Sequence, residues 1–441
     1  MPRLLSSFAQ VAVAIVLLAA GFFPGATFAQ PPVRLRPIDE NKAAAAGIRK
    51  IAGKHVTVYT DLPAAAAIDE LPQIFELAIP QWCDYFGVPI AKTADWKLRA
   101  YVMSRKERFQ GSGLMPDYLP PFPYGYYREF EFWLYDQPSD FYRRHLFLHE
   151  GTHAFMFHFL GGGGPPWTSE GMAEHFGTHS WKDGKLQMRH FPVSKEESPE
   201  WGRIKVIRDD FAAGGGLTAD RVMAFGPGAH TSPQAYAWSW ALCVFLDSHP
   251  RYQTAFRKLK ADVEPGATFN DRLRAELGPE NWTYLQEEWQ IFVAQVDYGY
   301  DIGRSAVIFE RGVPLPMGGG LAKIGAERSW QSSRWRVEKG KTYEITAQGK
   351  FVVGKTTKPW ISEPPGVTIR YHNQRPLGMV LAAVREETGD GRLTGLLDTI
   401  PVGAGTSFVA PRHGTLYLKI NESSGGLADN EGSIDIRITP K

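Results

Sequence analysis

Apolar and polar positions follow two different periods along the chain, and the change of period divides it near residue 300. Before that point, short alternating runs predict strands at 55–59, 96–103 and 129–135. Longer apolar runs with helical spacing lie between and after these strands. They predict helices at 64–86, from Ser139 and Asp140 onward, and at 234–246, 252–259, 269–277 and 282–293. The first part is therefore expected to combine a small sheet with helices.

After residue 329, short alternating runs bounded by turn residues dominate the chain. These runs predict strands at 333–337, 343–347, 366–371, 378–384, 406–410, 416–420 and 433–438. Short strands with turn residues between them are typical of an all-β sandwich. The expected fold class is therefore α+β, with a C-terminal β-sandwich.

The N-terminus has the pattern of an export signal. Arg3 precedes an apolar run at 11–23, and Thr27-Phe28-Ala29 is a small-x-small cleavage site. The pattern leaves an uncleaved membrane anchor open as the alternative. In both cases the body is exported, either secreted or periplasmic. No other segment is long and apolar enough to span a membrane.

Composition changes then set the expected boundaries. These are a signal peptide at 1–29, a Pro- and Ala-rich lead-in at 30–47, a first domain at 48–300, a Gly-rich linker at 301–326 and the β-sandwich at 327–441.

Charge and cysteine content narrow the function classes. The formal net charge is only +2, whereas a nucleic-acid-binding chain is expected to be strongly basic. The two cysteines, Cys83 and Cys243, do not have metal-ligand spacing. An exported compartment permits a disulfide between them, and two free buried thiols are the alternative.

A zinc-binding pattern lies in the helix predicted from Ser139. His149, Glu150 and His153 form an H-E-x-x-H motif. Positions i and i+4 share one face of a helix, so both imidazoles can bind one zinc ion, and Glu150 lies close enough to transfer protons.

A second acidic run supplies the remaining groups. Glu170 is the expected third ligand, because catalytic zinc takes three protein ligands and keeps one open position. Glu174, one turn further, can accept the outer ring N–H of a ligand histidine. His145 lies near the same face as His149 and His153, but three successive turns are too far apart to converge on one ion. His145 is therefore expected to be a neighbour and not a ligand.

H-E-G-T-H followed by W-T-S-E-G-M-A-E resembles the gluzincin zinc metallopeptidases. The resemblance implies that His149, His153 and Glu170 bind zinc, that Glu150 is the general base and acid, and that Glu174 orients a ligand. It also implies that 48–300 is a peptidase domain, with a downstream Tyr or His that donates to the oxyanion. Tyr236 is the preferred candidate for that donor, and His230 is the second.

The resemblance further implies that a sheet edge strand holds extended peptide. The strand at 130–135 is the candidate for this role, and an internal core strand is the alternative. The aromatic loop at 118–127 either lines the substrate cleft or simply packs.

The C-terminal tail gathers hard oxygen ligands in a short loop. Asn421, Glu422, Asp429 and Asn430 lie within ten residues and suit Ca²⁺, although an acidic turn is the alternative. Residues 329–439 resemble the PA-IL-type galactose-binding lectin domain.

That resemblance implies calcium ligands from the side chains of Glu422, Asp429 and Asn430 and from the carbonyls of Val353 and Gly426. Glu422 stands where the family has an aspartate, and the segment 372–374 departs from the sugar-contacting pattern.

These features together indicate an exported zinc metallopeptidase with a calcium- and glycan-binding-like C-terminal domain. The expected partners are a peptide or protein substrate and a glycan, with no nucleic acid and no membrane span after signal cleavage. A carbohydrate- or surface-binding protein on an inactive peptidase scaffold is the alternative. Hydrolysis of another amide, such as a cell-wall peptide, would use the same site.

Overall fold

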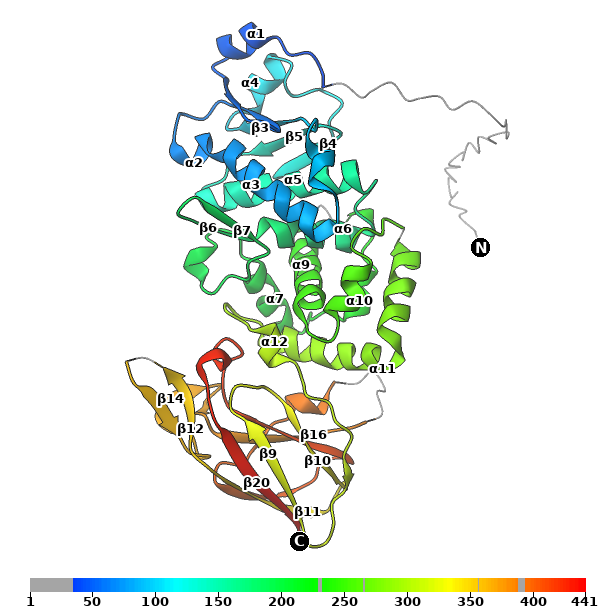
Figure 1. The fold of residues 1–441 in the computed structure, drawn as a ribbon, viewed down its shortest axis with the longest axis vertical. Coiled ribbons are helices and arrows are strands. Elements are labelled where there is room, and N and C mark those ends of the chain that lie inside the picture. Colours follow the sequence, from blue (N-terminus) through cyan, green and yellow to red (C-terminus); the bar gives the residue numbers. More distant parts are fainter. Residues whose placement is uncertain (1–34, 229–231, 265, 356, 388–392) are drawn as a thin grey trace, which may run out of the picture. The chain divides into compact units, whose positions relative to one another are not determined.

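The computed structural model describes residues 35–228, 232–264, 266–355, 357–387 and 393–441 (Figure 1). The expected signal peptide at 1–29 lies outside these residues. Residues 37–441 form one compact unit of mixed α and β structure. No helix in the described ranges is long and apolar enough to cross a membrane.

The described α-helices lie before residue 306, and most of the strands lie after residue 312. The helices are α1 (Glu40–Ala45), α2 (Ala66–Asp69), α3 (Leu71–Phe86), α4 (Lys106–Gly111), α5 (Asp140–Phe159), α6 (Pro166–Gly177), α7 (Arg203–Ala212), α8 (Ala219–Met223), α9 (Pro233–Ser248), α10 (Gln253–Lys258), α11 (Gly266–Gln295, kinked at Gly278) and α12 (Ile302–Ser305).

The strands in the first part are β1 (Arg49–Ala52), β2 (Val56–Thr60), β3 (Leu98–Met103), β4 (Gly125–Arg128), β5 (Glu131–Tyr135), β6 (His179–Lys182) and β7 (Lys185–Met188). The predicted strands and helices of this part are confirmed, except that the run at 64–86 is split into α2 and α3. The split falls at Glu70, just before Pro72, which occupies the first turn of α3.

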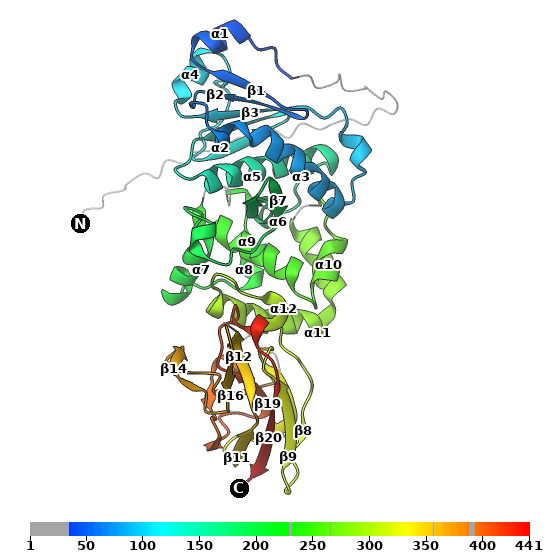
Figure 2. The ribbon, with the colours of Figure 1, turned by 60° about the vertical axis from the view of Figure 1, so that its left-hand side comes forward.

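The first sheet has the order β1-β2-β3-β5-β4, and helices cover both of its faces (Figure 1 and Figure 2). Val58, Ala100 and Phe132 pack with α3 and α5 on one face. Tyr101 and Trp133 pack on the other face with residues of α1 and α4. Alternate residues of each strand therefore pack in two separate hydrophobic cores. Helix α5 lies below the sheet in Figure 1 and Figure 2.

The edge of this sheet beside α5 is β4, which pairs antiparallel with β5. The expectation that 130–135 is the edge strand is therefore wrong, because β5 lies between β3 and β4. The segment 118–127 is expected to be an aromatic loop. Its end nevertheless belongs to β4, because Gly125–Arg128 forms a ladder with the regular strand β5.

Three helices place the chemistry-bearing side chains. Helix α5 begins where the sequence predicts, since Ser139 Oγ accepts the N–H of Tyr142 at 3.1 Å. Helix α6 begins with Pro166 at a position where a missing N–H costs nothing. Its Gly171 lies against the Ser239 carbonyl and Cys243 Sγ of α9, where a Cβ would lie 2.5 Å from both atoms. This close approach fixes α6 on α9.

The strand-rich part consists mainly of two sheets that share one hydrophobic core. Its strands are β8 (Val313–Pro314), β9 (Gly320–Gly325), β10 (Gln331–Val337), β11 (Thr342–Gln348), β12 (Phe351–Lys355), β13 (Pro359–Ser362), β14 (Val367–His372), β15 (Arg375–Leu377), β16 (Val380–Arg385), β17 (Ile400–Pro401), β18 (Gly405–Val409), β19 (Gly414–Ile420) and β20 (Ser433–Pro440). The sheets have the orders β17-β16-β19-β10-β8 and β18-β11-β20-β9. All the strands predicted after residue 329 are present.

The expected linker at 301–326 is wrong for its last residues. Gly320–Gly325 forms β9, which pairs along its whole length with β20. Gly318 and Gly319 hid this strand, because the chain turns at Met317 and Gly318 just before it. Within the strand, Leu321 and Lys323 are exposed and Ile324 is buried, as expected for a strand with one buried face.

Cys83 and Cys243 are both buried free thiols. The disulfide alternative is therefore wrong. Cys243 packs against α6, where its Sγ lies 3.7 Å from the carbonyl oxygen of Trp167.

Candidate metal centre

Helices α5 and α6 bring three potential ligand atoms to one point. Nε2 of His149 lies 3.1 Å from Nε2 of His153. Oε2 of Glu170 lies 3.4 Å from each of these nitrogens. The three atoms therefore form a nearly equilateral triangle, from residues separated in sequence by the turn between the two helices.

The size of this triangle fits a tetrahedral zinc ion. With zinc–ligand distances of about 2.0–2.1 Å, the ligands of a tetrahedron are separated by about 3.3–3.4 Å. Oε2 of Glu170 is buried and has no hydrogen-bond partner among the described residues. A buried carboxylate oxygen without a partner is costly, and a cation at the centre of the triangle would satisfy it.

The electrostatics of the triangle favour positive charge. Burial opposes protonation of His149, but the carboxylates of Glu170 and Glu174 raise its pKa to about 10. Burial likewise favours the neutral form of Glu170, yet His153 and His149 hold the pKa of Glu170 well below its usual value. The site thus stabilises a cation, either a proton or a metal ion.

Glu174 lies behind the triangle and contacts one ligand from its outer side. Its Oε1 is 3.4 Å from Nδ1 of His149. Two hydrogen bonds of 2.9 Å from Arg203 clamp both carboxylate oxygens, and Trp201 Nε1 donates to Oε2 at 3.3 Å. Glu174 is only 1% exposed, so this pair is fully buried. The clamp fixes the carboxylate and, through it, the ring of His149.

A second group of possible ligands consists of His145, His149 and Glu174. His145 Nε2 lies 3.3 Å from Oε2 of Glu174. However, the guanidinium of Arg203 already neutralises this carboxylate, and a metal ion there would face a fixed positive charge. The triangle with Glu170 therefore suits a metal better, and His145 lies beside it as a neighbour.

Glu150 lies in a recess beside the triangle and is 5% exposed. Burial raises the pKa of its carboxyl group, so its proton affinity is greater than that of a solvated glutamate. The recess is lined by Pro123, Tyr124, Gly125, Tyr142, Leu146, His149, Glu150, Glu174, Arg203 and Tyr236. It therefore combines a carboxylate that can move protons with the outer side of the candidate metal site.

Tyr236, from α9, also lines the recess. Its ring centroid lies 5.8 Å from that of His149, and the Arg203 guanidinium lies 5.5 Å from the Tyr236 ring. Burial raises the pKa of Tyr236, so its hydroxyl remains a proton donor. His230, the second candidate donor, lies outside the described residues.

The aromatic loop at 118–127 reaches the recess through Tyr124. Tyr118 lies further out, where the Arg128 guanidinium stacks 4.7 Å from its ring centroid. The loop therefore contributes both to the wall of the recess and to the surface beside the edge strand β4.

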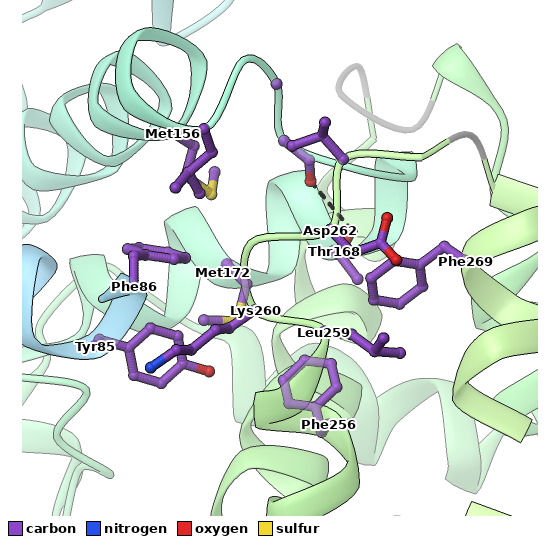
Figure 3. A pocket seen from close by; sticks show the side chains of 14 residues that line it. Tyr85, Phe86, Met156, Thr168, Met172, Phe256, Leu259, Lys260, Asp262 and Phe269 are labelled. Carbon is purple, nitrogen blue, oxygen red and sulfur yellow. Dashed lines mark hydrogen bonds between the residues drawn. The ribbon is translucent and has the colours of Figure 1, made fainter. Parts of the chain in front are cut away.

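Another cavity lies on the opposite face of α6 and does not reach the triangle. Thr168 and Met172 line it, two residues before Glu170 and Glu174 respectively (Figure 3). Most of its wall is apolar, from Tyr85, Phe86, Met156, Phe256 and Phe269. Its charged side chains are Lys260 and Asp262, and Asp262 is already paired with Arg272 at 2.6 Å. The cavity offers no convergent groups for chemistry.

The predicted calcium ligands lie in and beside one loop after β19. Asp429 Oδ2 accepts the N–H of Lys355, the last residue of β12, at 2.8 Å, and Val353 lies two residues before Lys355. Asn430 donates to the Ala326 carbonyl, while its buried Oδ1 has no partner among the described residues. Burial raises the pKa of Glu422, and the nearby charge of Asp429 adds to this effect. Gly426 lies against Glu422, where a Cβ would be 2.6 Å from Oε1.

Sequence reasoning missed the residues that support the triangle from a distance. Arg203 and Trp201 follow Glu174 by 29 and 27 residues and belong to no motif. Gly125 was missed because it lay in a segment expected to be a loop. The one available signal was weak: a buried carboxylate at Glu174 needs a cationic partner, but the sequence does not say which arginine.

No family model and no curated protein matches the chain. Among solved structures, a PllA-like lectin, the EclA N-terminal domain, is 17% identical and covers 28% of this chain and 96% of its own, with a TM-score of 0.22. The IMPa metallopeptidase from Pseudomonas aeruginosa is 10% identical and covers 60% of this chain and 25% of its own, with a TM-score of 0.18. The IMPa metallopeptidase in complex with T-antigen is also 10% identical, and covers 89% and 42%, with a TM-score of 0.18.

The chain therefore spans less than half of either IMPa chain. These three solved structures are of a lectin and of a metallopeptidase, and all three likenesses are weak and partial. Support for a function comes from the side-chain geometry and not from these likenesses.

Proposed function

We propose that the chain is an exported zinc metallopeptidase that hydrolyses peptide bonds, with a gluzincin-like domain at 48–300. The observation that carries this proposal is the triangle of His149 Nε2, His153 Nε2 and Glu170 Oε2, with sides of 3.1, 3.4 and 3.4 Å. Three ligands on one side leave an open position on the other, which is the arrangement of a catalytic zinc site.

The metal site and Glu150 have different roles in the proposed hydrolysis. A bound zinc ion supplies Lewis acidity, which acidifies a water molecule and polarises a carbonyl group. Glu150 takes the proton of the attacking water and delivers it to the leaving amine nitrogen. Its raised pKa suits both steps, because the group must gain and then lose a proton near neutral pH.

Tyr236 and β4 complete the proposed site. The protonated hydroxyl of Tyr236 donates to the oxyanion that forms on the substrate carbonyl. The free edge of β4 pairs with an extended peptide by main-chain hydrogen bonds. Glu174, held by Arg203 and Trp201, keeps the His149 ring in its ligand orientation.

Chelation tests the proposed activity. The mature protein should cleave peptides in a mixed peptide library, lose this activity after treatment with a zinc chelator, and regain it on addition of about one equivalent of zinc. Mass spectrometry of the library identifies the cleaved bonds. Cleavage that survives complete zinc removal would show that another site is responsible.

We further propose that residues 327–441 form a lectin-like β-sandwich that binds calcium and docks on glycan. Asn430 Oδ1, which has no partner among the described residues, and the half-buried carboxyl of Glu422 beside Asp429 are unfavourable without a cation. Asn421 Nδ2, at the start of this loop, donates a hydrogen bond of 2.8 Å to the carbonyl oxygen of His372. The β14–β15 hairpin therefore lies beside the proposed cation site, with Tyr371 exposed for sugar stacking.

Calcium should raise the melting temperature of the wild-type protein through this loop. Binding to the folded state alone contributes about 2.7 kcal/mol at 100 times Kd. Glu422→Gln keeps the shape but removes the charge, and should lose most of the shift. Glu431→Gln is the matched control, because Glu431 is exposed in the same segment and pairs with Lys355 instead. Equal calcium shifts in all three proteins would refute the loop as the cation site.

A further inference from the structure

Gly125, the first residue of β4, lies directly against the side chain of Glu150. An ideal Cβ at Gly125 would lie 2.3 Å from Oε1, 3.0 Å from Cδ and 3.1 Å from Cγ of Glu150. The whole carboxyl arm of Glu150 therefore lies against the bare Cα of Gly125. These three atoms, all from Glu150, are the nearest ones to that point.

The backbone at both residues is held in place. Gly125 pairs with Leu134 across the β4–β5 ladder, and the N–H of Tyr135 donates to the Tyr124 carbonyl at 2.9 Å. Glu150 lies in the middle of α5, whose neighbouring side chains are buried. If a side chain were added at position 125, the part that could yield is the Glu150 side chain and not either backbone.

Glycine is not needed at position 125 for its backbone freedom. Its φ lies outside the left-handed region, so any residue can adopt this conformation. The absence of a side chain matters only for the space that Glu150 occupies. Gly171 differs, because a Cβ there would collide with the backbone of α9 and disturb the fold.

We infer that Gly125 is a positioning residue that sets the location of the Glu150 carboxylate by leaving it room against the edge strand. This inference rests on the proposed peptidase function. The edge strand thus has a second role besides pairing with a peptide, because it forms one wall of the space that holds the general base. Ordinary van der Waals contact begins near 3.4 Å, so a methyl group at position 125 displaces Oε1 by about 1 Å.

Gly125→Ala tests the inference, with Gly111→Ala as the matched control. Gly111 ends α4, has open space around its Cα and also lacks a positive φ. Gly125→Ala should lower kcat about 10- to 100-fold, because displacement of a catalytic group by about 1 Å has effects of this order. Zinc content and melting temperature should match those of Gly111→Ala, because the ligand triangle does not touch Gly125.

A double-mutant cycle with Glu150→Asp separates positioning from general damage. The shorter aspartate withdraws from Gly125, so the added methyl group should cost less than about threefold in this background. Equal losses in both backgrounds would overturn the inference and make the effect structural. So would wild-type kcat in Gly125→Ala. A wild-type protein that binds zinc but lacks any turnover would instead remove the proposed function and this inference with it.

Discussion

Replacing Glu150 by glutamine should abolish peptide cleavage and leave zinc binding intact. Loss of a general base costs about 10²–10⁴-fold in rate, and glutamine cannot take a proton from water. The side chain keeps its volume, so the packing against Gly125 is preserved. The three ligand atoms belong to other residues, so the zinc content should equal that of the wild type.

The matched control for this variant is Glu107→Gln, which makes the same change on the exposed surface of α4. It should retain full activity. Steady-state kinetics on a peptide identified from the library, together with elemental analysis, decide the outcome. Retained cleavage in Glu150→Gln would assign the base to another residue. Loss of zinc from it would show that Glu150 serves the metal site and not proton transfer.

Replacing Glu170 by glutamine should remove zinc, whereas replacing His145 by glutamine should not. The two substitutions distinguish the two groups of possible ligands that share His149. Within the part of the chain that the structure describes, Glu170 Oε2 has no hydrogen-bond partner, and a neutral amide is a poor substitute for it. Even partners that only contact a ligand change metal affinity by about 10- to 100-fold, so loss of a ligand should exceed that range.

His145→Gln, the comparison variant, removes a neighbour of Glu174 but leaves the Arg203 clamp in place. Zinc affinity measured by competition with a chromophoric chelator gives the ranking. If His145→Gln loses zinc and Glu170→Gln keeps it, the metal is bound by the second group, which consists of His145, His149 and Glu174. Activity should follow zinc occupancy in both variants.

The candidate metal site could be predicted from the sequence because its geometry is local to two helices. The i, i+4 spacing on α5 and the first turns of α6 determine which side chains face one another once the helices pack. The packing itself was not predictable. It depends on Gly171 meeting α9 and on the guanidinium of Arg203, which comes from a separate helix.

The strands β4 and β9 show where prediction from the apolar–polar periodicity of the sequence fails. β4 has only four residues and begins with glycine, and β9 begins and ends with glycine, so neither segment shows strong apolar–polar alternation in the sequence. Their pairing with the regular strands β5 and β20 imposes the extended conformation. Tertiary pairing of this kind overrides local propensity, and it placed β4, not β5, at the sheet edge beside Glu150.

Zinc content per chain, measured together with peptide turnover in the mature wild-type protein, tests the central claim most directly. Elemental analysis after dialysis without chelator should give about one zinc per chain, and that preparation should cleave peptides. A protein without zinc even after reconstitution would contradict the metal site. A protein with one zinc and no turnover on any peptide would contradict the peptidase proposal and favour a glycan- or surface-binding protein on an inactive scaffold.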